Sequence, residues 1–403
     1  MKLEKLPIEF TKALPVVAQI EAAGFEAYFV GGSVRDVLLG QPIHDVDIAT
    51  SAFPAEIKQI FPRTIDVGIE HGTVLVLEGE ESYEITTFRT ESTYQDFRRP
   101  DHVEFVRSLE EDLKRRDFTI NAFALKEDGE IIDLFGGLVD LKDKILRAVG
   151  NPHERFHEDA LRMMRGLRFI SYLGFQMEQE TFDAICENHE LLEKISVERI
   201  FIEFNKLLLG NYRIEAIKSF VETECYQYCP GLRDKGAELL NFADLPAKKI
   251  PSEAQAWALL ADQLRLQTTD LRSFLKKWKA SNELIAETRA IFQGLQWRKE
   301  HPWQPLEIYQ LAEYAIKAEE LMFYYDRKPD TETVQSMIAA LPIHSLKELA
   351  INGHDLMETF KMKPGKWLKD VLEQCEKAVI LRQIENSKSV LLDYAKSYLE
   401  ENQ

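Results

Sequence analysis

The chain has 403 residues, of which 45% are apolar, and its formal net charge is −18. This length is too great for one hydrophobic core, so we expect about two to four domains. The acidic balance argues against a general nucleic-acid-binding protein, because such proteins are normally basic, and any nucleic-acid partner would have to meet local basic patches.

The N-terminal residues carry charge and no long apolar run, and no stretch of about 18 apolar residues occurs in the chain. We therefore expect no secretory signal and no membrane contact. The cysteines lack the spacing of a zinc site, which favours reduced structural thiols in a cytoplasmic protein. The cysteines are Cys186, Cys225, Cys229 and Cys375.

Residues 1–149 alternate short β-rich segments with helical patterns, which predicts an α/β fold with a small mixed sheet. Strands are predicted at 27–30, 45–49, 73–78, 82–88, 102–106 and 130–135, and helices at 33–39, 54–61 and 140–148. From Asn151 onward strand signals almost vanish. Helical periodicity follows, as in 154–173, 196–210 and 367–384.

Two aspartates in the sequence HDVDIA point to a metal site. Residues i and i+2 of a strand share a face, so Asp45 and Asp47 would lie side by side, with Val46 and Ile48 packed on the opposite face. Two adjacent carboxylates repel each other, and a strand that served packing alone would not carry them. Mg²⁺ prefers one or two carboxylates plus substrate phosphates. An exposed strand end with solvated charges is the alternative.

The residues just upstream favour the metal interpretation. Gly31 and Gly32 follow an apolar strand and precede a helix, and glycines let backbone N–H groups approach a phosphate. Ser33 is a candidate N-cap, and Arg35 in the first helical turn could reach a triphosphate with its fork of donors. A phosphate cradle beside a metal platform suits metal-assisted transfer of a nucleotidyl group.

The sequence GGSVRD…DVDIAT resembles the signature of polymerase-β-like nucleotidyltransferases. More narrowly, it is similar to the class II group that holds bacterial CCA-adding enzymes and poly(A) polymerases. RRDFTINA at 115–122 and the segments 133–150 and 158–162 stand in the order that this family shows. The resemblance covers residues 1 to about 210 with high specificity, and the C-terminal part is similar but less diagnostic.

The resemblance implies a multidomain, elongated chain with an α/β head and an all-α neck, body and tail. The expected ranges are 1–149 for the catalytic head, 150–211 for a neck with the base-recognition motif, 212–325 for the body and 326–403 for a tRNA-binding tail. It also implies Mg²⁺, held by Asp45 and Asp47, which would activate the tRNA 3′-hydroxyl for attack on the α-phosphate of CTP or ATP.

The segment HEDALRMMRGLRF carries Asp159, Arg162, Arg165 and Arg168 at three-residue spacing, which predicts one side of one helix. Cytosine and adenine both present an amino donor beside a ring-nitrogen acceptor. A carboxylate and a guanidinium match that edge and mismatch uracil and guanine. In the resembling family this Asp and Arg template the base, which implies the same role for Asp159 and Arg162. Arg165 and Arg168 would stack on the base, hold phosphates or brace the pocket. A solvated helix face is the alternative.

Several further candidates stay open. Glu84 is either a third metal-site carboxylate or part of a solvated strand face. Asn121 is either a contact to a sugar hydroxyl or a cap. The resemblance implies a nucleotide-binding role for Arg116, and Asp117 is another candidate substrate contact.

The stretch 89–106 is predicted to be a long loop, and in the family the matching loop helps the site switch from C to A. His71 and the Gly353–Asp355 turn are interpreted as structural.

The favoured activity is template-independent addition of C, C and A to the 3′ end of tRNA with release of pyrophosphate. A poly(A) polymerase or A-only enzyme on the same scaffold is the first alternative, and a non-catalytic RNA- or nucleotide-binding protein is the second. The expected partners are CTP, ATP and tRNA, whose acceptor end and elbow would meet lysines of the helical part. Candidates for those lysines are Lys276, Lys277, Lys363 and Lys366. The sequence does not fix the oligomeric state, and a homodimer is among the states it allows.

Overall fold

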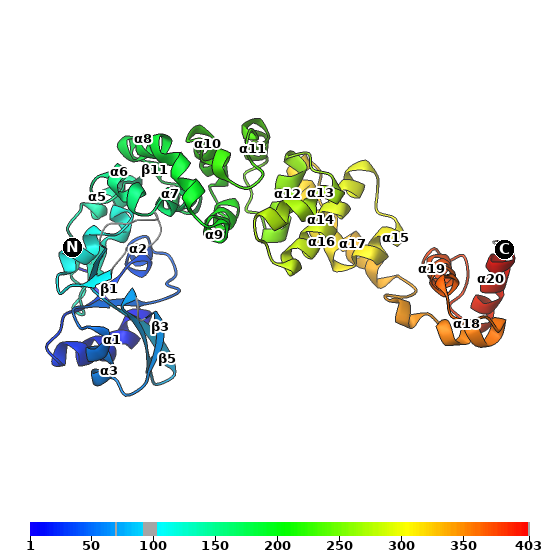
Figure 1. Ribbon diagram of the computed structural model, residues 1–403, viewed down its shortest axis with the longest axis horizontal. Coiled ribbons are helices and arrows are strands. Elements are labelled where there is room, and N and C mark those ends of the chain that lie inside the picture. The colour runs from blue at the N-terminus through cyan, green and yellow to red at the C-terminus, as the bar shows by residue number, and fades with distance from the viewer. Residues whose placement is uncertain (69–70, 92–102, 402–403) are drawn as a thin grey trace. The chain divides into compact units, whose positions relative to one another are not determined.

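The computed structural model describes residues 1–68, 71–91 and 103–401. The chain forms two compact units (Figure 1). The first comprises Met1–Ala243 with Ala247–Lys249 and Lys277–Lys279, and the second comprises Asp244–Pro246, Ile250–Lys276 and Ala280–Gln403. The division after Ala243 falls inside the range 212–325, so the four domains expected from the sequence stay a prediction.

The first unit contains a seven-stranded mixed sheet, which confirms the predicted α/β head. The strand order is β3-β4-β5-β2-β1-β8-β9. β2 and β5 are parallel, and the other neighbouring pairs are antiparallel. The strands are β1 Ala27–Val30, β2 Asp47–Thr50, β3 Thr64–Gly68, β4 Thr73–Glu78, β5 Glu81–Thr87, β8 Phe123–Leu125 and β9 Ile131–Asp133.

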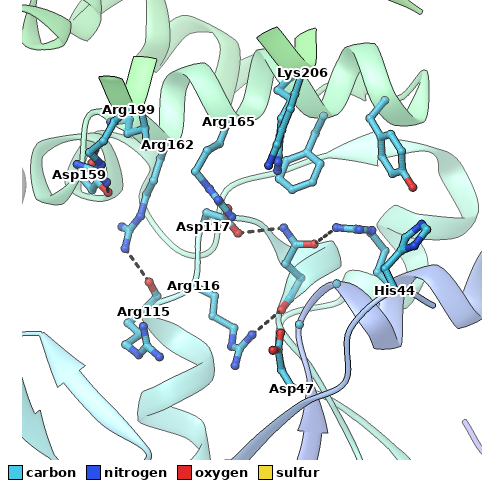
Figure 2. A pocket seen from close by; sticks show the side chains of 18 of the residues that line it. His44, Asp47, Arg115, Arg116, Asp117, Asp159, Arg162, Arg165, Arg199 and Lys206 are labelled. Atoms are coloured by element: carbon cyan, nitrogen blue, oxygen red, sulfur yellow. Dashed lines mark hydrogen bonds and ion pairs between the residues drawn. The ribbon is translucent and has the colours of Figure 1, made fainter. Parts of the chain in front are cut away.

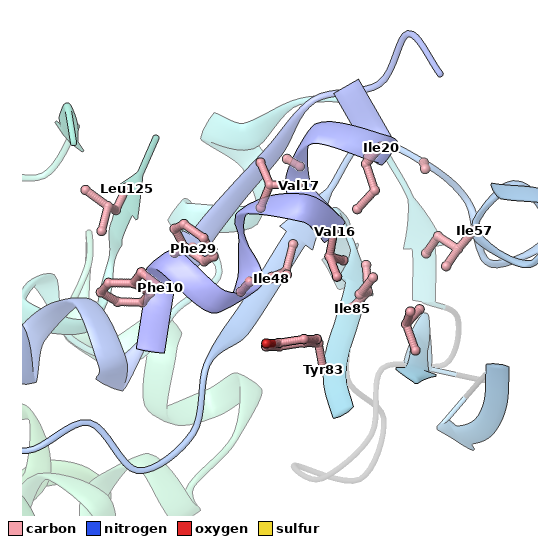
Figure 3. Packing of buried hydrophobic residues seen from close by; sticks show 14 of the residues in the cluster. Phe10, Val16, Val17, Ile20, Phe29, Ile48, Ile57, Tyr83, Ile85 and Leu125 are labelled. Carbon is pink, nitrogen blue, oxygen red and sulfur yellow. The ribbon is translucent and has the colours of Figure 1, made fainter. Parts of the chain in front are cut away.

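Alternation along the strands sends side chains to two faces of this sheet. On one face Phe29 and Ile48 pack with Val17 and other residues of helix α1 (Ile8–Ala22) in a buried core (Figure 3). On the other face Val30 and Ala49 join a smaller cluster. Asp47 alternates with Ile48 and therefore belongs to the face away from α1.

Four short helices complete the head, together with short strands outside the sheet. The helices are α2 Gly32–Leu38, α3 Pro54–Ile60, α4 Leu109–Lys114 and α5 Gly137–Asp143, and Thr119–Asn121 form a 3₁₀ turn. β6 (Arg89–Glu91) pairs with β7 (Val103–Phe105), so the two ends of the predicted loop 89–106 form a small ladder. Residues 92–102 of that predicted loop lie outside the described residues.

The structure corrects one predicted helix of the head and adds elements that were not predicted. The predicted helix 140–148 ends at Asp143, because Lys144 adopts a left-handed conformation and Ile145–Leu146 form strand β10, which pairs with β11 (Gln176–Met177). Helix α1 is absent from the prediction, since Pro15 inside it weakens a helical signal. Strands β3 and β8 are also absent from it, and β8 lies within the apolar end of the RRDFTINAFAL sequence.

Apart from strand β11, the rest of the first unit is helical, as predicted. Its helices are α6 Pro152–Glu158, α7 Leu161–Leu173, α8 Gln179–Asn188, α9 Val197–Leu208, α10 Arg213–Glu222 and α11 Gly236–Ala243, with 3₁₀ turns at His189–Lys194 and Cys225–Tyr228. One continuous helix over 154–173 was expected from the periodicity, and this is wrong. Asp159 has φ −139° and ψ 101°, an extended conformation that separates α6 from α7.

The second unit is all-α. Its helices are α12 Glu253–Gln263, α13 Thr268–Lys277, α14 Asn282–Glu300, α15 Pro305–Leu311, α16 Glu313–Glu320, α17 Thr331–Ala339, α18 Gly353–Phe360, α19 Lys366–Ile380 and α20 Lys388–Glu401, with 3₁₀ turns at Leu321–Tyr325 and Leu346–Glu348. Among the described residues, no helix has the length and apolar character needed to cross a membrane.

Two structural interpretations are confirmed. Asn352 caps α18, because its side-chain oxygen accepts hydrogen bonds from the backbone N–H groups of His354 and Asp355, and the Asp355 carboxylate accepts one from the Asn352 N–H. All four cysteines are free thiols, and burial raises the pKa of Cys225 to about 12. The GHD sequence is therefore a helix start, and the cysteines are unpaired thiols, three of them buried.

Candidate active site

A cavity of about 1070 Å³ lies within the first unit, between the sheet end and the helices that follow it (Figure 2). Eight of the nine predicted site residues line it; the exception is Asp45. The lining residues are Gly31, Gly32, Arg35, His44, Asp47, His71, Arg89, Arg115, Arg116, Asp117, Asn121, Asp159, Leu161, Arg162, Arg165, Arg168, Phe169, Tyr172, Arg199, Lys206, Leu209 and Gly210.

The glycine turn and the aspartate strand meet at the edge of the cavity. Antiparallel pairing sets Val30 opposite Asp47, so the chain after Val30 passes close to the carboxylate. Gly31 has φ +76°, and a Cβ atom there would lie 3.4 Å from Asp47 Oδ2 and 3.5 Å from Arg116 Nη1. These are ordinary contact distances, so it is the positive φ, and not a lack of space, that favours glycine here. Gly31, and not Ser33, occupies the N-cap position of α2, and the Ser33 hydroxyl instead donates to the Val30 carbonyl.

Three carboxylates gather at the strand end. Parallel pairing of β2 with β5 sets Glu84 beside Asp47, and Glu84 is exposed, so both alternatives given for it, a metal-site carboxylate and a solvated strand face, stay open. Asp45 precedes the strand, which begins at Asp47, and both are exposed, while Val46 and Ile48 pack in the opposite core as predicted. Restricted hydration and the charges of Glu84 and Asp45 raise the pKa of Asp47, and Arg116 opposes that rise.

Carboxylates that repel each other in this way fit a hard divalent cation, which takes oxygen ligands. In the described ranges, no three His, Cys, Asp or Glu side chains are arranged closely enough to hold a metal by themselves. The carboxylate set therefore suits an ion that completes its shell with phosphate oxygens and water.

A hydrogen-bonded chain crosses the floor of the cavity (Figure 2). Arg35 Nη1 donates to Asn121 Oδ1 at 2.6 Å, Asn121 Nδ2 donates to Asp117 Oδ1 at 3.0 Å, and Arg165 Nε donates to Asp117 Oδ2 at 2.7 Å. Burial by itself would raise the pKa of Asp117, but Arg165, Asn121 and the Phe118 N–H outweigh it and hold this pKa well below its usual range. Asp117 thus accepts hydrogen bonds from both Asn121 and Arg165, and Asn121 connects Asp117 to Arg35.

The sequence predicts that Arg35 offers its fork of N–H donors to a triphosphate. In the structure these donors bind other side chains instead. Its Nε and Nη2 atoms donate to Asp36 Oδ1 at 2.9 and 2.8 Å, and Nη1 is bound to Asn121. The residue is only 6% exposed. It lines the cavity as a buried, fixed positive charge.

Three guanidinium groups surround the ring of Phe169. The Cζ atoms of Arg168, Arg35 and Arg165 lie 4.2, 5.2 and 5.8 Å from its centroid. Cation–π attraction helps to hold these groups together in spite of their mutual repulsion. Burial and the neighbouring positive charges lower the pKa of Arg168, although Glu203 offsets part of this effect. The cluster gives the cavity a positive potential that favours a polyanionic ligand.

Arg116 is positioned by Asp112, a residue that sequence reasoning missed. Arg116 Nη2 donates to Asp112 Oδ2 at 3.2 Å, and Arg115 donates twice to Asp112 Oδ1 at 2.9 and 2.8 Å. Burial alone would raise the pKa of Asp112, but the two arginines lower it. The guanidinium of Arg116 is thereby directed toward Asp47.

Asp159 and Arg162 both line the cavity but do not share a helical face. Asp159 lies in the break before α7, where Oδ1 accepts from the Leu161 N–H at 3.0 Å and Oδ2 pairs with Arg199 Nη2 at 2.6 Å. Arg162 is 7% exposed. It donates to Glu158 Oε2 at 2.6 Å, to the Arg155 carbonyl at 3.1 Å and to the Arg115 carbonyl at 2.8 Å. Tertiary contacts, rather than helical spacing, orient this pair.

Comparison with known proteins identifies the family. Residues 27–147 match the model described as "Poly A polymerase head domain", and 174–235 match "Probable RNA and SrmB- binding site of polymerase A". The chain is 59% identical over 397 residues to the CCA-adding enzyme of Enterococcus faecalis, with 98% of each chain covered, and 52% identical over 402 residues to that of Ligilactobacillus salivarius, with all of both chains covered. The chain belongs to the family of CCA-adding enzymes. Membership implies nucleotidyltransferase chemistry with a divalent metal.

A solved structure agrees over nearly the whole chain. The Bacillus stearothermophilus CCA-adding enzyme in complex with CTP is similar with a TM-score of 0.92 and 40% identity, covering 98% of this chain and 99% of that one. Residues 248–395 also match a model for domain 2 of tRNA nucleotidyltransferases. The predicted family, fold class and enzyme class are confirmed.

The structure adds cavity residues that no sequence signal indicated. Arg199 and Lys206 come from α9, and Tyr172 follows the predicted arginine stripe on α7. His71, interpreted as structural, also lines the cavity, and its carbonyl accepts a hydrogen bond from Arg89. The seven-residue spacing of Arg199 and Lys206 indicates one helix face, but nothing in the sequence showed which cavity that face would meet.

Proposed function

We infer that this protein adds C, C and A to the 3′ end of tRNA, using CTP and ATP and releasing pyrophosphate. The observation that carries this inference is the single cavity that joins an aspartate strand end, an arginine cluster and a carboxylate–guanidinium pair. Relatives that cover the whole chain are CCA-adding enzymes, and one of them is known in complex with CTP.

We propose Mg²⁺ as the metal and Asp45 and Asp47 as its protein ligands. Glu84, which pairs in register with Asp47, is the candidate for a third carboxylate. When bound, the ion would neutralise triphosphate charge and lower the pKa of the tRNA 3′-hydroxyl. Arg116, directed at the same corner by Asp112, would bind the phosphates beside it.

The arginine cluster suits the triphosphate. We propose that Gly32 allows the backbone to approach a phosphate, and that Arg165 and Arg168 attract the anion from the wall around Phe169. Arg35 would contribute its fixed charge and hold Asn121, because its three donor nitrogens are already engaged.

We propose that Asp159 and Arg162 read the base. The Asp159 carboxylate would accept from the exocyclic amino group of cytosine or adenine, and Arg162 would donate to the adjacent ring nitrogen. Glu158 and two carbonyls fix the Arg162 guanidinium before the nucleotide arrives, so a base would share or displace one of these partners. Preorganisation of this kind sharpens discrimination, because a mismatched edge finds donors and acceptors that cannot turn.

We also propose that the helical body and tail bind tRNA. Lys276 and Lys277 end α13, and Lys363 and Lys366 flank the start of α19; all four are exposed. They would meet phosphates of the acceptor arm and elbow, in spite of the overall negative charge. We keep two further predictions. One is that residues 89–106 take part in the switch from C to A addition, and the other is a homodimeric state.

The test is nucleotide incorporation into tRNA transcripts that end before the first C. Each labelled NTP is supplied alone and then all four together, and the product 3′ ends are sequenced. Addition of C, C and A followed by arrest is expected. A product that carries only A, or a long A tail, would favour the A-adding alternatives, and absence of transfer would defeat the proposed activity.

A further inference from the structure

One wall of the cavity has no part in the mechanism described so far. It consists of Tyr172 at the end of α7 with Lys206 and Leu209 at the end of α9, and we call it the α7–α9 wall. The proposed nucleotide contacts use Asp159 and Arg162 for the base and the Asp47 corner for the phosphates. In Figure 2, Lys206 lies on the other side of the Asp117–Arg165 pair from Asp159 and Arg199.

This wall is held rigidly. The Ser171 hydroxyl donates to the Leu207 carbonyl at 2.5 Å, and the Tyr212 N–H donates to the Ser171 carbonyl at 2.9 Å. A Cβ atom on Gly210 would lie 2.0 Å from Ser171 Oγ, so the end of α9 approaches α7 as closely as a glycine permits. Tyr172 and Lys206 are therefore presented from two helices whose ends are fixed to each other.

The chemistry of the wall differs from that of the arginine cluster. Arg165, Arg168 and Arg199 are each ion-paired with a carboxylate. In the part of the chain that the structure describes, Lys206 has no ion-pair partner, and it is exposed. Tyr172 is 45% exposed in spite of its large ring. An exposed aromatic ring and an unpaired cation that line the same cavity are a combination that suits single-stranded nucleic acid, by stacking on a base and attracting its phosphate.

We propose that the α7–α9 wall binds the 3′-terminal nucleotide of the RNA acceptor, with Tyr172 stacked on its base and Lys206 near its phosphate. This inference rests on the proposed function, which requires a second substrate in the same cavity with its 3′-hydroxyl at the α-phosphate. Stacking tolerates any base, and this suits an acceptor end that changes after each addition. The segment that matches the RNA-binding family model includes Lys206 but not Tyr172.

The first test measures KM for a tRNA acceptor and for CTP separately. Tyr172→Leu is expected to raise KM for RNA about tenfold, because one base stack is worth about 1–3 kcal/mol. KM for CTP stays unchanged, and Tyr172→Phe recovers most of the RNA affinity. Lys218→Ala is the control for Lys206→Ala, since Lys218 is an exposed lysine on α10 outside the cavity.

The second test asks whether Tyr172 meets the terminal base itself. With an acceptor whose 3′-terminal nucleotide is abasic, Tyr172→Leu should bind RNA as well as the parent protein does. Lys206→Ala should reduce the slope of log affinity against log salt by about 0.7, the value for one phosphate contact to single-stranded nucleic acid. Lys218→Ala should leave that slope unchanged.

Two results would overturn the inference. One is a raised KM for CTP with an unchanged KM for RNA, which would assign the wall to the incoming nucleotide. The other is an equal loss for Tyr172→Leu on normal and abasic acceptors. Both results presuppose transfer by the parent protein, so they are distinct from the failure of the proposed function, in which no nucleotide is added at all.

Discussion

The strand end that carries Asp47 and the helical wall that carries Asp159 reach the same cavity by different means. At the strand end, sequence neighbours remain spatial neighbours: the glycine turn and the two aspartates lie within residues 31–47, and strand β1 pairs directly with strand β2. At the helical wall, Asp159 is held by Arg199, which is 40 residues away, and Arg162 is held by the carbonyl of Arg115, which is 47 residues away. Local motifs can therefore reveal the glycine turn and the two aspartates of the first region, whereas the second depends on contacts between distant segments.

The largest expected effect lies at the strand end. Asp47→Asn should reduce the rate of both C and A addition by more than about a hundredfold, because a metal ligand supplies several kcal/mol of transition-state stabilisation. The fold should persist, since Asp47 is exposed. Single-turnover rates and thermal melting test this, with Asp128→Asn as an exposed carboxylate control in the same unit. Retention of more than about a tenth of the rate would contradict the metal-ligand role.

The next effect tests the helical wall. Asp159→Ala and Arg162→Ala should each weaken discrimination by about 1–3 kcal/mol, or roughly tenfold to a hundredfold. UTP or GTP incorporation relative to CTP should become measurable, because the phosphate and metal contacts remain.

The measurement is single-nucleotide incorporation with each of the four NTPs. Arg165→Ala is the comparison, and it should slow all nucleotides evenly, since Arg165 is bound to Asp117 and not to the base-reading pair. Wild-type selectivity for C and A in both the Asp159 and the Arg162 variants would place the template elsewhere.

A smaller effect concerns Asp117, whose hydrogen bonds connect the helical wall to the residues near the strand end. Asp117→Asn removes the charge that anchors Arg165, and should lower the free energy of unfolding of the first unit by about 2 kcal/mol near neutral pH. The folded pKa of Asp117 lies below its unfolded value, so its charge stabilises the fold above about pH 4, and this contribution is lost as pH falls further.

Urea unfolding of the parent and variant at neutral pH and below pH 4 checks the sign. The difference between the two proteins should shrink in acid. A difference that stays constant, or grows, would mean that the ionised carboxylate of Asp117 does not carry the stabilisation.

The smallest effect is outside the cavity altogether. Asn352→Ala removes the cap of α18 and should destabilise that helix by about 1 kcal/mol. Hydrogen exchange of the first turn of α18 should accelerate, while KM for CTP stays unchanged. A changed KM for CTP would show that the second unit influences nucleotide binding.

The head was predicted well where one physical pattern dominates. Strand β1 and strand β4 were predicted with correct bounds, because their apolar runs alternate or stay buried between turn residues. Helix α1 was missed because Pro15 obscures it, and β10 was read as helix because a two-residue parallel pairing leaves no local signature. The family, the fold class and the enzyme class followed from motif resemblance, and the comparisons confirm them.

The sequence by itself determined the aspartate strand and the glycine turn. Strand periodicity and the left-handed conformation of Gly31 are local properties of the backbone. Only the tertiary structure decided the break at Asp159, the engagement of Arg35 with Asp36 and Asn121, and the arrival of Tyr172 and Lys206 at one wall. Buried charges need partners, and those partners come from wherever the fold brings a complementary group, so their identity is a property of packing rather than of sequence spacing.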